Sequence, residues 1–165
     1  CHECEQQREY FTETKEVVYK VRDMDVPIVA TLAYCKGCGS ELFHPDLDAA
    51  NQEKVFDIYR KDKGLLKPEQ IKSIRKKYGL TQRDFSRLLG FSEITITRYE
   101  NGSLPTFAHN QIIKDSESPV KMMDFLDKNA SKISQTEADR LRELVKGGDE
   151  SCLKLRSYCQ WFICR

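Results

Sequence analysis

The spacing of apolar residues changes near residue 45, which divides the chain into a strand-forming part and a helix-forming part. Residues 10–22 alternate in polarity, as a strand with one buried face does. The two alternating sets are Val17, Tyr19 and Val21 on one side and Val18, Lys20 and Arg22 on the other. A predicted turn at Met24–Asp25 leads into a second β-branched run over residues 26–34, where Pro27 places the start at an edge or strand end. The pattern predicts a β-hairpin.

Two helices are predicted after the hairpin. The first spans residues 45–63, begins near Pro45 and ends at Lys63–Gly64. Its expected apolar face carries Leu47, Val55, Phe56, Ile58 and Tyr59, and its polar face carries Glu53, Lys54, Asp57, Arg60 and Lys61. The second runs from Pro68, which suits the first turn of a helix, to about Tyr78. Its expected inward residues are Ile71, Ile74 and Tyr78, and its outward residues are Lys72, Arg75, Lys76 and Lys77. This charged face is either solvated or able to hold a phosphate.

The stretch from Leu80 to Gly102 predicts two short helices joined by a tight turn at Gly90. Thr81, with Asp84 three residues later, and Ser92 are the expected N-caps. Phe85, Leu88 and Leu89 give the first helix an apolar face, and Ile96 and Tyr99 do so in the second, opposite Glu93, Ile94, Thr97 and Arg98. Asn101–Gly102 ends the second helix. This is the pattern of a helix-turn-helix, whose second helix enters the DNA major groove, and an ordinary αα-hairpin is the alternative.

Three further helices are expected in the C-terminal third. The first covers residues 108–114 and Pro119 opens the second. The apolar residues of these two are Ile112, Ile113, Val120, Met123, Phe125 and Leu126. Ser134 and Glu137 form a capping box for the third, which Gly147–Gly148 ends; its apolar residues are Ala138, Leu141, Leu144 and Val145. In the tail, Cys152, Cys159 and Cys164 lack metal-like spacing, and Trp161, Phe162 and Ile163 are expected to pack or associate.

The composition is that of a soluble globular protein. Of the 165 residues, 39% are hydrophobic and 32% are charged. The sequence contains neither an apolar run long enough to span a membrane nor a visible secretory signal, so a cytoplasmic location is expected. The chain begins with Cys1 rather than Met, so we expect its natural N-terminus to have been trimmed or lost.

The net charge of +1 hides an uneven distribution along the chain. Residues 1–64 carry nine Lys and Arg against thirteen Asp and Glu, whereas residues 65–103 carry eight against four. The positive block coincides with the predicted helix-turn-helix, as expected of a surface that binds phosphates. The acidic N-terminal part is better suited to a protein partner than to DNA.

Four of the seven cysteines form two C-x2-C pairs, Cys1 with Cys4 and Cys35 with Cys38. Two such turns can place four thiolates in a tetrahedron, which suits a structural Zn²⁺ ion. Gly37 and Gly39 are expected to supply the positive φ of the second turn. A redox pair and disulfides are the alternatives. Four thiolates fill the site, so His2 and His44 are expected to be bystanders and a catalytic zinc is not expected.

These observations predict an α+β chain. A small zinc-bound β-hairpin domain is expected over residues 1–44, a linking helix over 45–64, an all-α helix-turn-helix domain over 65–128, and a C-terminal helix and tail over 129–165. Because the hairpin has few apolar residues, the metal is expected to supply much of its folding energy.

Residues 1–128 resemble the YgiT/MqsA-type antitoxins, in which a CxxC…CxxC zinc domain precedes an Xre-like (lambda-repressor-like) helix-turn-helix. The resemblance is carried by the two cysteine pairs, Cys38–Gly39, Leu80–Thr81–Gln82, Gly90 and the run from Thr97 to Gly102. The segment from Glu93 to Ser103, followed by Ala108–His109–Asn110, is similar to antitoxins associated with a SocA/Panacea-type C-terminal domain. Glu5 departs from the pattern, because the family usually has Gly there, and so does the tail.

The resemblance implies a transcriptional repressor that neutralises a toxin, binds operator DNA, controls its own operon and dimerises through its last helices. The DNA contacts that it implies are Gln82, Arg83, Ser92, Glu93, Ile94, Thr95, Thr97 and Arg98. Gln82 is expected on a phosphate or the outermost base, and Ser92 and Thr97 on phosphates. The remaining residues of the second helix are expected at base edges.

The chemistry of these residues agrees with such contacts. Arg98 can donate two hydrogen bonds to guanine, and Ile94 can pack on a thymine methyl group or, alternatively, in the core. Glu93 can accept from cytosine N4 or merely favour the N-terminus of the helix. Glu100 is expected to bond within the domain.

Three functions are compatible with the sequence. The first is a DNA-binding antitoxin and autorepressor. The second is a phage or mobile-element regulator with the same DNA chemistry and no toxin partner. The third is a thiol enzyme, against which stands the lack of a Cys–His–Asp constellation outside the cysteine cluster, so we predict that the chain is not an enzyme.

Overall fold

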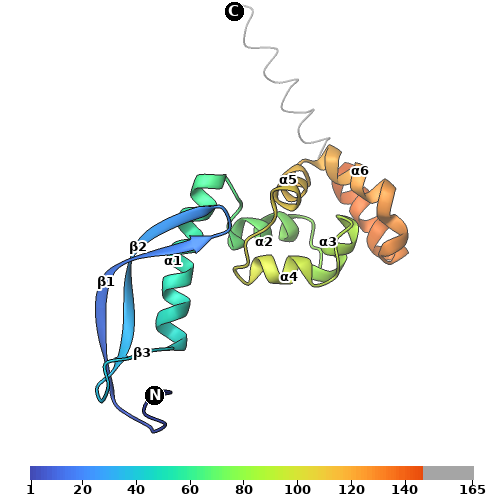
Figure 1. Ribbon diagram of the computed structural model, residues 1–165. Helices are drawn as coiled ribbons and strands as arrows, with labels where there is room; N and C mark the ends of the chain where they lie inside the picture. Colours follow the sequence, from blue (N-terminus) through green and yellow to red (C-terminus); the bar gives the residue numbers. More distant parts are fainter. Residues whose placement is uncertain (147–165) are drawn as a thin grey trace, which may run out of the picture. The chain divides into compact units, whose positions relative to one another are not determined.

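The computed structural model describes residues 1–146, which fold as two compact units, one of residues 1–65 and one that begins at Leu66 (Figure 1). The elements are β1 (Tyr10–Val21), β2 (Met24–Cys35), β3 (Glu41–Leu42), α1 (Pro45–Lys63), α2 (Pro68–Lys77), α3 (Gln82–Leu88), α4 (Thr95–Glu100), α5 (Phe107–Asp115), α6 (Pro119–Asn129) and the 3-10 turn η1 (Ala130–Lys132). A further helix covers residues 135–146. The α+β prediction is confirmed.

The predicted hairpin is present, but its turn lies two residues earlier than expected. Strands β1 and β2 pair antiparallel from Val21–Met24 to Tyr10–Cys35. Met24 therefore belongs to the first pair beside the turn, and Arg22 and Asp23 form the turn itself. Arg22 takes the left-handed conformation, with φ of 52°, that closes so short a connection. Strand β3 pairs with β2 and was not predicted, because two residues carry too little pattern.

Helix α1 lies along the hairpin (Figure 1). The alternate residues Val26, Ile28, Ala30 and Leu32 of β2 are buried, as are Val55 and Tyr59 of α1. The helix has the predicted bounds. His44 caps its N-terminus through Nδ1, which accepts from Leu47 N at 3.5 Å, and Gly64 ends it with φ of 60°.

The buried stripe of α1 differs from the predicted one. Arg60, expected on the polar face, is only 3% exposed and forms an ion pair with Asp57, while Ile58, expected on the apolar face, is 39% exposed. The buried side of α1 is the one that packs on β2. It carries Asn51, Val55 and Tyr59, which are spaced four residues apart.

Asn51 also completes the sheet. Its side-chain amide bonds to both backbone groups of Thr31, accepting from N at 3.2 Å and donating to O at 2.8 Å. Lys54 donates to Val29 O at 3.3 Å along the same edge. Side chains of α1 thus satisfy β2 backbone groups beyond the short strand β3.

The second unit has one core, to which α2, α3, α4, α5, α6 and the helix of residues 135–146 contribute. Its largest fully buried apolar side chains are those of Ile71, Tyr78, Phe85, Leu88, Ile96, Ile113, Met122, Leu126 and Leu141. Burial raises the pKa of Tyr78 to about 12, and its hydroxyl donates to Glu117 O at 2.9 Å. This core fixes the two helices of the helix-turn-helix to a rigid scaffold.

Thr81 caps α3 as predicted, accepting from Asp84 N at 3.1 Å, and Gly90 turns the chain with φ of 77°. The expected role of Ser92 is wrong in detail, because α4 begins at Thr95. Ser92 O accepts from Thr95 N at 3.0 Å, and the two hydroxyl groups are 2.7 Å apart. Residues 92–94 therefore form a turn that leads into the helix.

The C-terminal helices follow the predicted pattern with two exceptions. Ser134 accepts from Glu137 N at 3.2 Å, which confirms that cap. Val120 and Leu144, expected on apolar faces, are 65% and 43% exposed, because Met122, Leu126, Leu141 and Val145 already fill the core. The predicted helix end at Gly147–Gly148 and the predicted packing of the tail lie outside the described residues.

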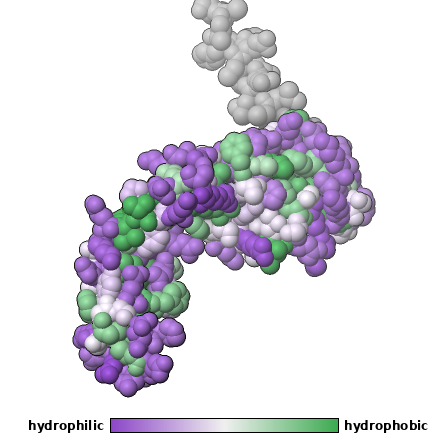
Figure 2. Space-filling model, viewed as in Figure 1, coloured by the Kyte–Doolittle hydropathy of each residue, from purple (hydrophilic) through white to green (hydrophobic). Residues whose placement is uncertain are grey.

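Figure 2 shows that hydrophilic side chains cover much of the visible surface, with smaller apolar patches between them. Within residues 1–146, no helix combines the length and the apolar character needed to cross a bilayer.

Candidate metal centre and nucleic-acid interface

The four predicted cysteines come together in the structure. Their Sγ atoms all lie within 4.8 Å of one another. The Sγ atoms of Cys1 and Cys38 are 3.6 Å apart, and those of Cys4 and Cys35 are 3.9 Å apart. Cys35 ends β2, Cys38 lies in the turn after it, and Cys1 and Cys4 precede β1, so the hairpin brings both pairs to one place.

These distances fit a tetrahedral metal site. Four sulfurs at about 2.3 Å from a zinc ion would lie about 3.8 Å from one another, and the two measured distances lie on either side of that value. They are far longer than a disulfide bond, and all four cysteines are free thiols. Four sulfur ligands leave no coordination position for a substrate, so such a site is structural.

The turn after β2 prepares the cluster. Gly37 N donates to Cys35 Sγ at 3.3 Å, and Gly39 N donates to Cys35 O at 2.8 Å. Gly39 has the predicted positive φ, of 74°, but Gly37 is not among the positive-φ residues, which corrects that part of the prediction. In the first turn Glu5 takes the left-handed conformation, with φ of 50°, which glycine adopts more readily.

The thiols polarise one another. Hydrogen bonds from Ser40 lower the pKa of Cys38 to about 7, and the side-chain oxygen of Ser40 lies 3.1 Å from Cys38 Sγ. The hydrogen bond to Cys38 raises the pKa of Cys4.

His2 and His44 lie outside this group of four ligands. The role of His44 is visible in its contacts, because its Nε2 lies 3.1 Å from Tyr10 Oη while its Nδ1 caps α1. The sequence did not reveal this cap, because His is an uncommon N-cap residue.

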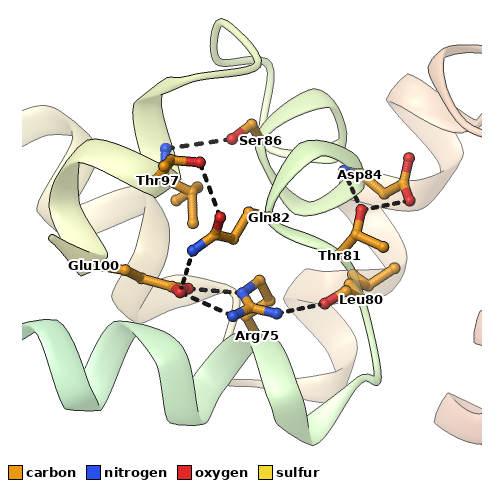
Figure 3. Close-up of polar contacts among 9 residues, drawn as sticks. Arg75, Leu80, Thr81, Gln82, Asp84, Ser86, Thr97 and Glu100 are labelled. Carbon is orange, nitrogen blue, oxygen red and sulfur yellow. Dashed lines mark hydrogen bonds and ion pairs between the residues drawn. The ribbon is translucent and has the colours of Figure 1, made fainter.

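A polar network fixes the two helices of the helix-turn-helix to α2 (Figure 3). Arg75 donates to both carboxylate oxygens of Glu100, at 2.6 and 2.8 Å, and to Leu80 O at 2.8 Å. Gln82 donates to Glu100 at 2.7 Å and accepts from Thr97 at 3.0 Å. The network links α2, α3 and α4 and sets the rotation of α4.

The placement of Arg75 corrects its predicted outward position. Its side chain is 12% exposed and that of Glu100 is 4% exposed. Burial alone would raise the pKa of Glu100, but the hydrogen bonds from Arg75 and Gln82 outweigh it and hold the pKa below its ordinary value. The predicted internal role of Glu100 is confirmed.

The opposite side of α4 faces away from the core. Ile94 is 53% exposed, as predicted, and Arg98 is exposed. Within residues 1–146, the Arg98 side chain has no hydrogen bond or ion pair. Arg98 is therefore free to meet a ligand from outside.

Arg83 and Glu93 are joined on the same surface. Arg83 Nε donates to Glu93 at 2.7 Å, and Arg87 also binds the Glu93 carboxylate, with Nε at 2.9 Å. These contacts lower the pKa of Glu93, most strongly through Arg87. Sequence reasoning missed Arg87, although its position four residues after Arg83 on one helix was a usable signal.

A shallow depression brings most of the predicted contact residues together. It is lined by Thr81, Gln82, Arg83, Glu93, Ile94 and Thr97. Ser92 and Thr95 are bonded to each other at the start of α4. Gln82 and Thr97 are part-buried in the network of Figure 3, so their polar atoms already have partners.

Comparison with known proteins identifies one family that covers the part of the chain carrying both candidate sites. A family model described as the antitoxin component of a bacterial toxin–antitoxin system, MqsA, matches residues 1–136. The match includes all four clustered cysteines and both helices of the helix-turn-helix. The chain belongs to the MqsA antitoxin family. The predicted resemblance to MqsA-type antitoxins is confirmed, and since the MqsA family is one of antitoxins rather than enzymes, so is the prediction of a non-enzymatic chain.

A second similarity is local. Antitoxin PezA of Streptococcus pneumoniae serotype 4 (strain ATCC BAA-334 / TIGR4) is 49% identical to this MqsA-family chain over 35 residues. The match covers 21% of the chain and 22% of PezA.

Proposed function

We propose that this MqsA-family antitoxin binds operator DNA in the cytoplasm through α3 and α4, represses its own operon as a homodimer, and carries a structural zinc ion. The observation that carries the DNA-binding part is the exposed Arg98, whose side chain has no partner among residues 1–146, beside the exposed Ile94. An apolar side chain and a free guanidinium group on the outer side of a helix are suited to base edges in the major groove.

The role of each residue follows from its surroundings. Arg98 donates to guanine O6 and N7, and Ile94 packs on a thymine methyl group. Thr95 lies at the start of the helix, where its hydroxyl can reach a base edge. Ser92 and Arg83 bind phosphates.

Gln82 and Thr97 act from within the network. Gln82 is held by Glu100, and Thr97 is held by Gln82. The remaining hydrogen-bond donors and acceptors of Gln82 and Thr97 contact the DNA backbone. Arg75 and Glu100 orient these contact residues without touching DNA. Phosphate contacts of this kind fix the register of the helix, and base contacts supply specificity.

Direct measurement of DNA binding tests this proposal. The chain is titrated onto DNA from upstream of its own gene and onto a scrambled duplex, with fluorescence anisotropy at several salt concentrations. We expect preference for the upstream DNA and a log–log salt slope of about −0.9 per phosphate contacted. Equal affinity for both duplexes, or a flat salt response, would refute the proposal.

The homodimer is supported by exposed apolar side chains on the helices that follow α4. Phe107 of α5 is 71% exposed and Val120 of α6 is 65% exposed. Two-fold pairing of two such chains would suit an operator with two half-sites. Mass measurement in solution, with Phe107→Ser expected to weaken association, tests this part.

The zinc assignment is supported by the four-sulfur geometry. Zinc would be held by Cys1, Cys4, Cys35 and Cys38, and would join the segment before β1 to the end of β2. One zinc ion per chain by elemental analysis is the expected result.

Membership of an antitoxin family implies a toxin partner. We propose that the N-terminal unit binds it, because residues 1–64 have an excess of acidic residues and carry none of the proposed DNA contacts. Co-expression with the product of the adjacent gene should relieve its toxicity and yield a complex. Loss of the complex on deletion of residues 1–64, with DNA binding retained, is the expected pattern.

A further inference from the structure

The cluster of Arg83, Arg87 and Glu93 is an ion-pair group that the proposed base contacts do not explain. Glu93 uses both carboxylate oxygens: Arg83 Nε bonds to Oε2 at 2.7 Å, and Arg87 Nε bonds to Oε1 at 2.9 Å. All three side chains remain partly exposed, at 63%, 33% and 48% for Arg83, Arg87 and Glu93. The cluster is therefore accessible to an external anion.

The cluster also lies where DNA is proposed to bind. Arg83 and Glu93 line the same depression as Ile94 and Thr97. Glu93 engages Arg83 through Nε and Arg87 through Nε and Nη2. These donors suit a DNA phosphate as well as a carboxylate, and the negative charge of Glu93 opposes the approach of a phosphate to both guanidinium groups.

We propose that Glu93 occupies the phosphate-binding groups of Arg83 and Arg87 in the free protein, and that it is a selectivity residue which suppresses binding to DNA of unrelated sequence. The proposal rests on the DNA-binding function proposed above. For either arginine to turn these bonded donors toward a phosphate, the carboxylate must leave it. Breaking the ion pair costs free energy on every DNA molecule, whatever its sequence.

The destination of the released carboxylate makes the cost depend on sequence. Glu93 is next to Ile94 at the start of the recognition segment, so its carboxylate turns toward the groove. A cytosine N4 amino group there donates to it, whereas guanine O6 and N7 and thymine O4 are acceptors that repel it. Only a sequence with a donor at that position compensates the loss of the arginines.

Substitution of Glu93 by Gln tests this inference in the full chain. Because exposed ion pairs are individually weak, releasing two arginines is expected to raise affinity for scrambled DNA roughly tenfold. The salt slope on scrambled DNA is expected to become more negative by about 1 to 2, as one or two more phosphates are contacted. Affinity for the upstream DNA should change less, so the ratio of upstream to scrambled-DNA affinity should fall.

Three further variants separate this selectivity role from a net-charge effect and from misfolding. Glu69→Gln removes the same charge from an exposed position on α2 and should leave the ratio unchanged. Arg83→Gln in the Glu93→Gln background should return the affinity for scrambled DNA toward the wild-type value. Circular dichroism of each variant confirms that it is folded, and Glu93→Asp, whose shorter side chain spans the two arginines poorly, provides a second folded test with a smaller rise.

Three results would overturn the inference. An unchanged affinity of Glu93→Gln for both duplexes would show that the cluster is only structural. If Glu93→Gln loses affinity for the upstream DNA and gains none for scrambled DNA, Glu93 contacts a base and does not suppress non-specific binding. An equal gain in Glu69→Gln would make the effect one of net charge. If the wild-type chain fails to distinguish the two duplexes at all, the proposed function itself fails, which is a separate and recognisable outcome.

Discussion

At the scale of single residues, backbone conformation and partner choice explain the departures from the sequence pattern. Glu5 has a positive φ because the first cysteine turn requires it, and an L side chain adopts this conformation at a cost. Arg60 is buried because it stacks beside Phe56 and pairs with Asp57. The partners of Arg60 lie three and four residues earlier on α1, but the helical repeat alone placed Arg60 on the polar face.

Glu5→Gly is predicted to stabilise the N-terminal unit by about 1 kcal/mol, since Gly adopts positive φ without strain. Denaturant unfolding of the full chain, followed by a probe in the sheet, measures it. Glu3→Gly is the matched control, because Glu3 has no positive φ and its replacement should not stabilise. A destabilised Glu5→Gly variant would contradict the account of this turn.

The pKa of Glu100 predicts how the stability of the helical unit depends on pH. A carboxylate whose pKa is lower in the folded chain stabilises it above the unfolded-state pKa of 4.5, and this contribution is lost as pH falls through the folded value. The free energy of unfolding should therefore decrease as the pH is lowered below about 4.5.

Glu100→Gln should reduce that acid dependence. At neutral pH the variant should lose on the order of 3 kcal/mol, because Arg75 is left nearly buried without its carboxylate partner. Urea unfolding from pH 3 to 7 measures both effects. Wild type and variant with parallel pH profiles would show that Glu100 does not stabilise through its charge.

At the scale of secondary-structure elements, the helices and the hairpin follow from periodicity, but their ends depend on contacts. Helix α1 has the predicted bounds because Pro45 and Gly64 mark both ends in the sequence. The hairpin turn and the start of α4 were misplaced, because pairing of Met24 with Val21 and bonding of Ser92 to Thr95 decide them. The burial of Asn51 arises from β2, a separate element.

The same distinction applies to the sites. The four cysteines were predictable, since a metal site imposes a regular spacing on the sequence. The exposure of Ile94 followed from the helical repeat. The pairing of Arg75 with Glu100, and of Arg87 with Glu93, was not predicted, because these partners are brought together by folding or by an irregular turn.

Removal of the metal is predicted to affect the elements of the two units differently. Chelation should unfold the cysteine end of the hairpin, because Tyr10 and Phe11 of β1 are exposed there and add little packing. The helical unit has its own core and should persist. Limited proteolysis with and without EDTA measures this, and EDTA saturated with zinc is the control. Uniform resistance to protease after chelation would contradict a structural metal.

At the scale of the whole molecule, the chain combines a cysteine cluster at one unit with a basic helix-turn-helix in the other. The family shows that it is an antitoxin, and the proposed division assigns the toxin to the N-terminal unit and DNA to α3 and α4. In this proposal α4 contacts base edges, with Arg98 as its main hydrogen-bond donor.

The most direct test of that claim compares wild type with Arg98→Ala on the upstream DNA and on duplexes in which each base pair is changed in turn. We expect Arg98→Ala to lose about 1–3 kcal/mol of binding free energy on the upstream DNA and to relax the preference at one guanine position. Arg142→Ala, which removes the same charge from the helix of residues 135–146, should change neither. An equal loss on every duplex would show that Arg98 contacts only phosphate and would contradict base reading by α4.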